Sequence, residues 1–141
     1  MKNNYIADFE KLGFGLFVHF GLYSIVGKGE WYLHLNPNAD KSEYESLSQQ
    51  FFVKQTWAKE LVNTAKLAGC KYITLTTRHH DGFSLFDTCG LSDYDAVHSA
   101  SKRDLIKEFV SACNESGIVP FFYHTLLDWR EENYQKDFSK Y

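Results

Sequence analysis

The chain has 141 residues, of which 44% are hydrophobic and 17% aromatic, and its net charge is −3. This length is enough for one compact domain, and without a cluster of lysines and arginines the chain is not expected to bind nucleic acid. The amino-terminal residues contain no continuous apolar region like that of a signal peptide, and no segment is long enough to span a membrane, so we expect neither secretion nor membrane insertion.

The first predicted element is a buried strand over residues 14–20, which is short, rich in aromatic residues and bounded by glycine. A polar segment follows, from Leu22 to about Gln55, with a short predicted helix over about 42–50. This segment is longer than a connection between a strand and a helix requires, which is typical of a functional loop.

The next two elements are a helix and a second strand. We expect Thr56 to be the N-cap of the helix and Gly69 to end it. The second strand is predicted over residues 71–77, where β-branched and aromatic residues dominate. The apolar face of the helix consists of residues at helical spacing, namely Trp57, Leu61, Ala65 and Ala68.

A polar loop separates these elements from a second helix and a third strand. Ser101 and Asp104 resemble a capping box, with Asp104 where Glu is usual, and Gly117 is expected to end the helix. The third strand is predicted over residues 118–124, with Pro120 close to its start, where proline is tolerated. The apolar face of this helix consists of Leu105, Phe109, Ala112 and Cys113.

The three cysteines do not have the spacing of a metal site. An odd number of cysteines without a secretory signal indicates free thiols in a reducing cytosol, so we expect a cytoplasmic protein. Cys70 and Cys113 lie in apolar patterns and are predicted to be core residues, whereas no pattern places Cys89. No motif indicates a bound cofactor.

The element order predicts an α/β fold with parallel strands joined by helical crossovers, in a single domain over residues 1–141. Three strands cannot close a barrel, which needs about eight. The chain is therefore either an open sheet or part of a larger barrel. In the second case Phe17, Leu75 and Phe121 would lie on a face without partners, and the chain would self-associate or require a complementary polypeptide.

Polar residues lie at or just past the carboxyl end of each predicted strand, and because these ends meet at one edge of a parallel sheet, we expect the side chains to converge there. A lone histidine such as His19 is more often structural, but an adjacent pair at 79–80, followed by Asp81 and Gly82, is stronger evidence of a site. The residues at the three strand ends are His19, His79, His80, Tyr123, His124, Asp128 and Trp129.

Polar residues in the loops have weaker signals. Glu30 and Trp31 combine a carboxylate with a flat ring, which suits a sugar contact, although an exposed acid beside a loop-anchoring tryptophan explains them equally well. The segment 102–104 is expected to cap and ion-pair the second helix. Asp93 and Asp95 are interpreted as solvated turn residues.

Six segments carry a family resemblance, and the most specific is His-His-Asp-Gly-Phe after a strand. The segments are GLFVHFGLYS at 15–24, EWY at 30–32, AGCKY at 68–72, TTRHHDGF at 76–83, KRDL at 102–105 and YHTLLDW at 123–129. Together, and in this order, they resemble the α-L-fucosidases of glycoside hydrolase family 29 over nearly the whole chain.

The resemblance implies a (β/α)8 TIM-like barrel, of which this chain carries about three parallel strands with their helices, and retaining exo-hydrolysis of terminal α-L-fucose. The family's tyrosine at the end of the third strand is matched to Tyr123, but His124 stands where many relatives have a second tyrosine, so either residue could face the sugar. The residues that the resemblance assigns to fucose binding are His19, Glu30, Trp31, His79, His80 and Tyr123.

The resemblance also implies what the chain lacks. A retaining glycosidase needs a nucleophilic and an acid/base carboxylate about 5–5.5 Å apart. In this family both lie beyond the matched segments, so no catalytic residue is predicted here and Glu30 is expected to bind. The chain is thus predicted to be an inactive N-terminal portion of the catalytic domain, with a fucosylated glycan as ligand and a complementary carboxyl-terminal half, or another copy, as partner.

Two other functions remain open from the sequence. One is a metal-dependent barrel hydrolase, although no His-x-x-x-His or Cys-x-x-Cys spacing supports it. The other is a non-catalytic carbohydrate-binding or scaffold domain that pairs with another polypeptide. The metal ligands would come from His19, His79, His80 and His124 with Asp81 or Asp128.

Overall fold

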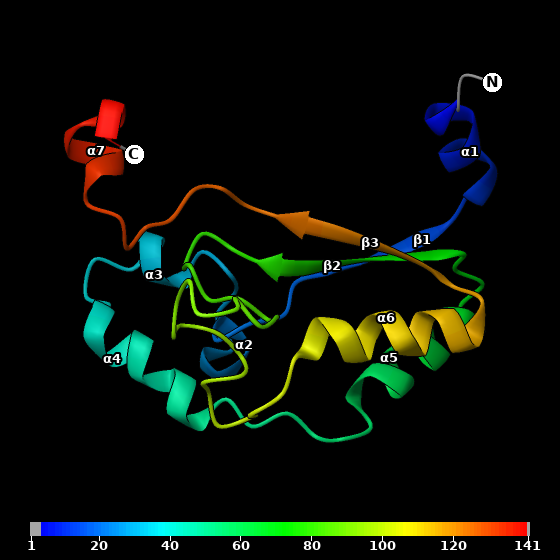
Figure 1. Cartoon of the computed structure of the whole chain (residues 1–141), viewed down its shortest axis with the longest axis horizontal. Helices are drawn as coiled ribbons and strands as arrows, with labels where there is room; N and C mark the ends of the chain where they lie inside the picture. Colours follow the sequence, from blue (N-terminus) through cyan, green and yellow to red (C-terminus); the bar gives the residue numbers. More distant parts are fainter. Residues whose placement is uncertain (1–3, 141) are drawn as a thin grey trace.

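A computed structural model of the chain describes residues 4–140 and shows a three-stranded sheet with its two longest helices on one face (Figure 1). The ends of the domain predicted over 1–141, namely residues 1–3 and 141, lie outside the described residues. The elements are α1 (Tyr5–Leu12), β1 (Gly15–Val18), α2 (Tyr23–Val26), α3 (Tyr32–Leu35), α4 (Lys41–Ser46), η1 (Leu47–Gln50), α5 (Trp57–Leu67), β2 (Tyr72–Arg78), α6 (Leu105–Ser116), β3 (Val119–His124), α7 (Asn133–Lys136) and η2 (Phe138–Lys140).

The sheet has the order β1-β2-β3, and both pairs of neighbours are parallel. Val18 pairs with Leu75, and Leu75 pairs with Phe122. Parallel neighbours need crossovers, which α5 and α6 supply on the same face, so all three strands end at one edge (Figure 1). The predicted α/β class with three parallel strands is confirmed.

The core lies between the sheet and the pair α5 and α6. Ile73 and Leu75 of β2 are fully buried there, as are Val62 of α5 and Phe109 of α6. The four predicted core residues of α6 are all buried, and so is Cys70. Cys89 is exposed, and each of the three cysteines is a free thiol.

The opposite face of the sheet is largely open. Phe17 of β1 is 52% exposed, and its ring contacts Tyr123 of β3 at a centroid distance of 5.8 Å. Phe9 of α1 covers the other end of this face through Phe121, at 5.6 Å. The assignment of Leu75 to the open face was wrong, since its place in β2 turns it toward the helices and buries it completely.

Strand β1 is shorter and less buried than predicted. It covers Gly15–Val18 only, and Phe14, which precedes it, is 64% exposed. The prediction of a buried strand was wrong because β1 pairs with β2 alone and one of its faces lies on the open side of the sheet.

The predicted ends of α5 and α6 are confirmed, but two of the predicted capping interactions are wrong. Thr56 precedes α5, yet its hydroxyl donates to the Glu60 carboxylate at 2.6 Å instead of capping the backbone. Asp104 alone caps α6, because its carboxylate accepts from the Lys107 amide at 2.8 Å. Ser101 is instead buried, and its hydroxyl donates to the carbonyl of Phe51. Ala68, which was predicted to lie on the apolar face of α5, is not among the buried residues of that helix.

Three further sequence predictions concern the charged segment 102–104, the exposure of Asp95 and the length of the helices. Arg103 pairs with Glu108 at 2.6 Å, which confirms the structural role of the segment 102–104. Asp95 is fully buried and accepts from the Thr88 hydroxyl at 2.9 Å, so its interpretation as a solvated residue was wrong. Over residues 4–140, no helix has both the length and the apolar character needed to cross a bilayer.

Candidate functional site

Three rings from three different strand ends meet at the carboxyl edge of the sheet. The centroid of His19, which follows β1, is 5.4 Å from that of His79, which follows β2. The ring of Tyr123, in β3, lies 5.9 Å from His79 and 6.1 Å from His19. The fold therefore brings together residues that are up to 104 positions apart (123 − 19) in the sequence.

A turn directly after β2 allows two adjacent histidines to face one site. The strand ends at Arg78, and the Gly82 amide donates to the carbonyl of His79 at 3.0 Å, with Gly82 at a φ of +80°. This left-handed conformation favours glycine. The rings of His79 and His80 consequently lie 4.5 Å apart, and the ring of Trp31 from the first loop lies 5.5 Å from His80.

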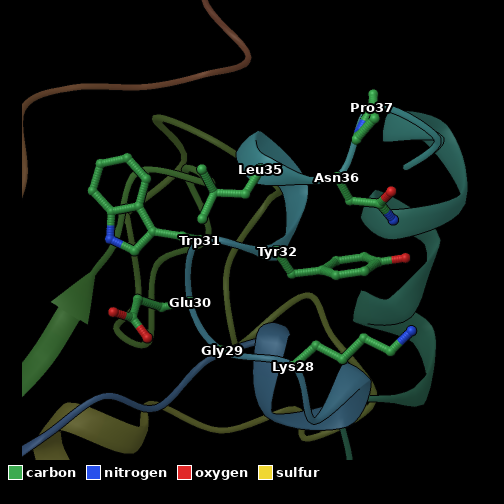
Figure 2. Close-up of a pocket in the computed structure, with 8 residues that line it drawn as sticks. All are labelled: Lys28, Gly29, Glu30, Trp31, Tyr32, Leu35, Asn36 and Pro37. Atoms are coloured by element: carbon green, nitrogen blue, oxygen red, sulfur yellow. The ribbon is translucent and has the colours of Figure 1, made fainter.

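The first loop contributes Glu30 and Trp31, which project to the same side of the chain, away from Tyr32 (Figure 2). The charge of Glu30 acts to raise the pKa of His79, against the larger effect of burial. Both residues also border a hollow of about 560 Å³. All six residues that the sequence assigned to the site therefore lie along one edge of the sheet and its first loop.

Burial makes His79 a neutral imidazole. The residue is 3% exposed, and this burial, reinforced by the facing rings of His80 and His19, lowers its pKa to about 4, while Glu30 opposes the shift. Its Nδ1 is buried and has no hydrogen-bond partner among the described residues. A buried polar atom without a partner is uncommon in folded proteins, which marks this ring as a candidate for a functional role.

His80 is oriented by a residue from the third strand end. Its Nδ1 lies 2.7 Å from the hydroxyl of Thr125, whose amide in turn donates to the carbonyl of Arg78. Burial also lowers the pKa of His80. With Nδ1 bound to Thr125, the Nε2 of His80 is the atom left to contact a ligand.

The two adjacent candidates at the end of β3 face opposite ways, as neighbours in a strand do. Tyr123 belongs to the ring cluster with His19 and His79. His124 lies on the other face, where its ring contacts Phe86 at 5.9 Å and its Nδ1 lies 3.2 Å from the Thr77 hydroxyl. Of the two alternatives, the structure places Tyr123 at the site.

Two buried hydroxyl groups, those of Tyr23 and Thr76, lie next to the histidine cluster. Neither residue was predicted from the sequence to be part of the site. The Tyr23 hydroxyl lies 3.1 Å from Thr76 Oγ1, which also accepts from the Phe20 amide at 3.0 Å. The ring of Tyr23 lies 5.7 Å from His79. No local motif announces this contact, because it joins residues 53 positions apart.

Asp81 and Asp128 have structural partners. Asp81 is 1% exposed and accepts from the Tyr44 hydroxyl at 2.7 Å and from the Phe83 amide at 3.3 Å, and its burial raises its pKa to about 6. Asp128 forms an ion pair with Arg78 at 2.5 Å. In the part of the chain that the structure describes, no three His, Cys, Asp or Glu side chains are grouped as a metal site would require.

One residue beside the site was missed in the sequence. The ring of His34, in α3, stacks on Trp129 at 5.0 Å and lies 5.6 Å from Trp31. The spacing of three residues from Trp31 to His34 is the signal that could have found it, since such pairs share one side of a helix.

The geometry can be compared with that of known proteins. A family model for α-L-fucosidase matches residues 1–141. The plasma α-L-fucosidase of Rattus norvegicus is 28% identical over 149 aligned residues, which cover 94% of this chain and 32% of that protein.

Two solved structures are similar to this chain. The α-L-fucosidase isoenzyme 1 from Paenibacillus thiaminolyticus has a TM-score of 0.80 and 37% identity over 91% of this chain and 30% of its own. A GH29 α-L-fucosidase from Bacteroides thetaiotaomicron, trapped as a covalent intermediate with 2-fluoro-fucosyl fluoride, has a TM-score of 0.85 and 31% identity over 97% and 33%. The chain spans about a third of the length of these relatives, and its match to the family model places it in the α-L-fucosidase family.

Proposed function

We propose that this chain supplies part of the fucose-binding pocket of a retaining α-L-fucosidase with a (β/α)8 barrel. The observation that carries the proposal is the buried, neutral His79, with its unpartnered Nδ1, among the rings of His19, His80 and Tyr123. The parallel three-stranded sheet, open on the face that would be the interior of a barrel, supports the barrel architecture.

The site suits a neutral, polyhydroxylated ligand. A neutral imidazole donates through one nitrogen and accepts through the other, so each histidine can pair with a sugar hydroxyl. Trp31 offers a flat ring to the C–H bonds of a sugar, and Glu30 offers an acceptor. Contacts of this kind also hold the ring on its way to an oxocarbenium-like transition state.

We infer that Glu30, Asp81 and Asp128 do not make the catalytic carboxylate pair that such a reaction needs. Asp81 is buried against Tyr44 and Asp128 is paired with Arg78, so of these three carboxylates only Glu30 has no hydrogen-bond or ion-pair partner named above. The Bacteroides relative trapped as a covalent intermediate supports a nucleophilic mechanism in the family. We therefore infer that the chain alone binds fucose but does not hydrolyse fucosides.

The proposal is tested by binding and by turnover. Titration of L-fucose into the isotopically labelled chain should shift the imidazole signals of His19, His79 and His80 in NMR spectra, and His79→Ala should abolish this response. His124→Ala, at the same strand end but on the other face, is the matched control and should leave it intact. No response in the wild-type chain would contradict the proposal.

Turnover is measured with an aryl α-L-fucoside, and none is expected. A pure preparation that hydrolyses this substrate at ordinary enzyme rates, about 1–10³ s⁻¹, would show that the catalytic carboxylates lie within this chain. Glu30→Gln would then be the first variant to test.

A further inference from the structure

The row of rings continues outward beyond the proposed fucose pocket. Trp129 lies 5.4 Å from His80 and 5.4 Å from Trp31, and His34 stacks on Trp129 at 5.0 Å with an interplanar angle of 18°. Exposure rises along this row, from the buried His79 through the half-buried Trp129 to the exposed His34. The rings thus form a continuous wall from the base of the site to its mouth.

Helix α3 adds apolar surface at the mouth of the site. Leu35 is 71% exposed and Trp31 is 40% exposed, and the two lie on one side of the helix with Leu35 beside Trp31 (Figure 2). Both border the hollow of about 560 Å³, a volume in the range of sites that hold small organic ligands, about 300–1,000 Å³. Trp31 therefore borders both the histidine cluster and this hollow.

The backbone around Trp129 is held in place by two hydrogen bonds and two neighbouring ion pairs. Its amide donates to the carbonyl of His80 at 2.8 Å, and its carbonyl accepts from the Lys41 ammonium group at 3.3 Å. The residues on either side are fixed by the ion pair of Asp128 with Arg78 and that of Arg130 with Glu45. A ring that is held so firmly beside a site can serve as a binding surface, because little ordering is needed when a ligand binds.

We propose that the outer rim, defined as Trp31, His34, Leu35 and Trp129, binds the neutral sugar ring that is joined to fucose in the substrate. The inference rests on the proposed function, since the rim adjoins the fucose pocket through His80 and Trp31. Flat rings and a leucine side chain match the apolar C–H face of a pyranose, and the His34 imidazole can pair with one of its hydroxyls.

The test compares the binding of a monosaccharide with that of a disaccharide. Calorimetric titration of the whole chain with L-fucose and with a neutral α-linked fucosyl-galactose should show that the disaccharide binds about three- to tenfold more tightly, as expected for one added ring contact. His34→Ala and Leu35→Ala should each remove most of this preference and leave the affinity for fucose within about twofold of the wild-type value.

Leu67→Ala is the matched control, because Leu67 is 90% exposed on the distant helix α5 and should affect neither ligand. Saturation-transfer NMR should show contact to the galactose ring in the wild type and a weaker contact in His34→Ala. Equal affinities for the two ligands, or a preference that survives both rim substitutions, would overturn the outer rim while leaving the fucose pocket in place. Failure of fucose itself to bind would overturn the proposed function and the rim together.

Discussion

At the scale of single residues, the burial of His79 makes stability depend on pH. Its pKa of about 4 lies below the ordinary value of 6.5, so the folded chain keeps this imidazole neutral while the unfolded chain protonates it. As the pH falls from 6.5 to 4, this group therefore lowers the free energy of unfolding by up to about 3 kcal/mol. Asp81, whose pKa is raised to about 6, acts in the opposite direction over part of the same range.

Because the two effects on stability overlap, the titration of His79 is best followed directly. Its imidazole signal in NMR spectra should titrate with a midpoint near pH 4, and the affinity for fucose should stay constant down to about pH 5.5 and fall below it. His98 is an internal reference, because its hydrogen bond to Asp95 raises its pKa above 6.5. A midpoint of His79 at or above 6.5 would show that the ring is not desolvated.

The hydroxyl of Tyr44 is expected to stabilise the buried carboxylate of Asp81. Tyr44→Phe removes the only side-chain donor found to Asp81 in the described structure, so the free energy of unfolding at pH 7 should fall by about 1.5–3 kcal/mol, as for a hydrogen bond to a charged group. Urea unfolding measures this change. Tyr32→Phe, which also deletes one hydroxyl but from a half-buried ring, should change it by less than about 0.5 kcal/mol.

At the scale of elements, the turn after β2 connects the histidine pair to the segment after β3. A Cβ at Gly82 would lie 2.7 Å from the carboxylate of Asp128, and that carboxylate pairs with Arg78. Gly82→Ala should therefore displace Asp128, weaken the hold on Trp129 and reduce the affinity for fucose and its glycosides.

A substitution at Gly90 is the control that distinguishes this clash from the strain of a left-handed backbone. Its φ of +84° resembles that of Gly82, but a Cβ there would meet nothing within 4 Å. Gly90→Ala should cost only the strain of a left-handed residue, about 1 kcal/mol, and leave ligand affinity unchanged. If the two variants lose affinity equally in calorimetric titrations, the contact between Gly82 and Asp128 has no role in the site.

The elements could be predicted from the sequence because each has a local signal. Gly117 ends α6 in a left-handed conformation, and the apolar spacing of its face is visible in the chain. The site residues could be found because they follow strands and match a family pattern. The Tyr23–Thr76 contact and the true role of Ser101 could not, because each depends on a packing partner that only the folded chain brings near. His34 had a sequence signal in its spacing from Trp31, but its stacking on Trp129 is visible only in the folded chain.

At the scale of the whole molecule, the open face of the sheet leaves apolar surface exposed. Phe17 is 52% exposed there, and β1 and β3 each pair with β2 alone within the described residues. Leaving such a face in water costs several kcal/mol at about 25 cal/mol per Å². We expect the chain to self-associate at micromolar concentration, as analytical ultracentrifugation would show, and Phe17→Lys to weaken this association. A cooperative monomer would contradict this expectation.

The order of the strands also determines what kind of assembly can form. The two free edges of a β1-β2-β3 sheet belong to different strands, so an all-parallel extension joins β1 of one copy to β3 of the next. Such a head-to-tail contact leaves an unused edge at each end of every assembly, and growth stops only if the curvature closes a ring. Parallel association through these edges would thus produce a concentration-dependent series of sizes instead of a discrete dimer, and its limit would be set by how the sheet twists.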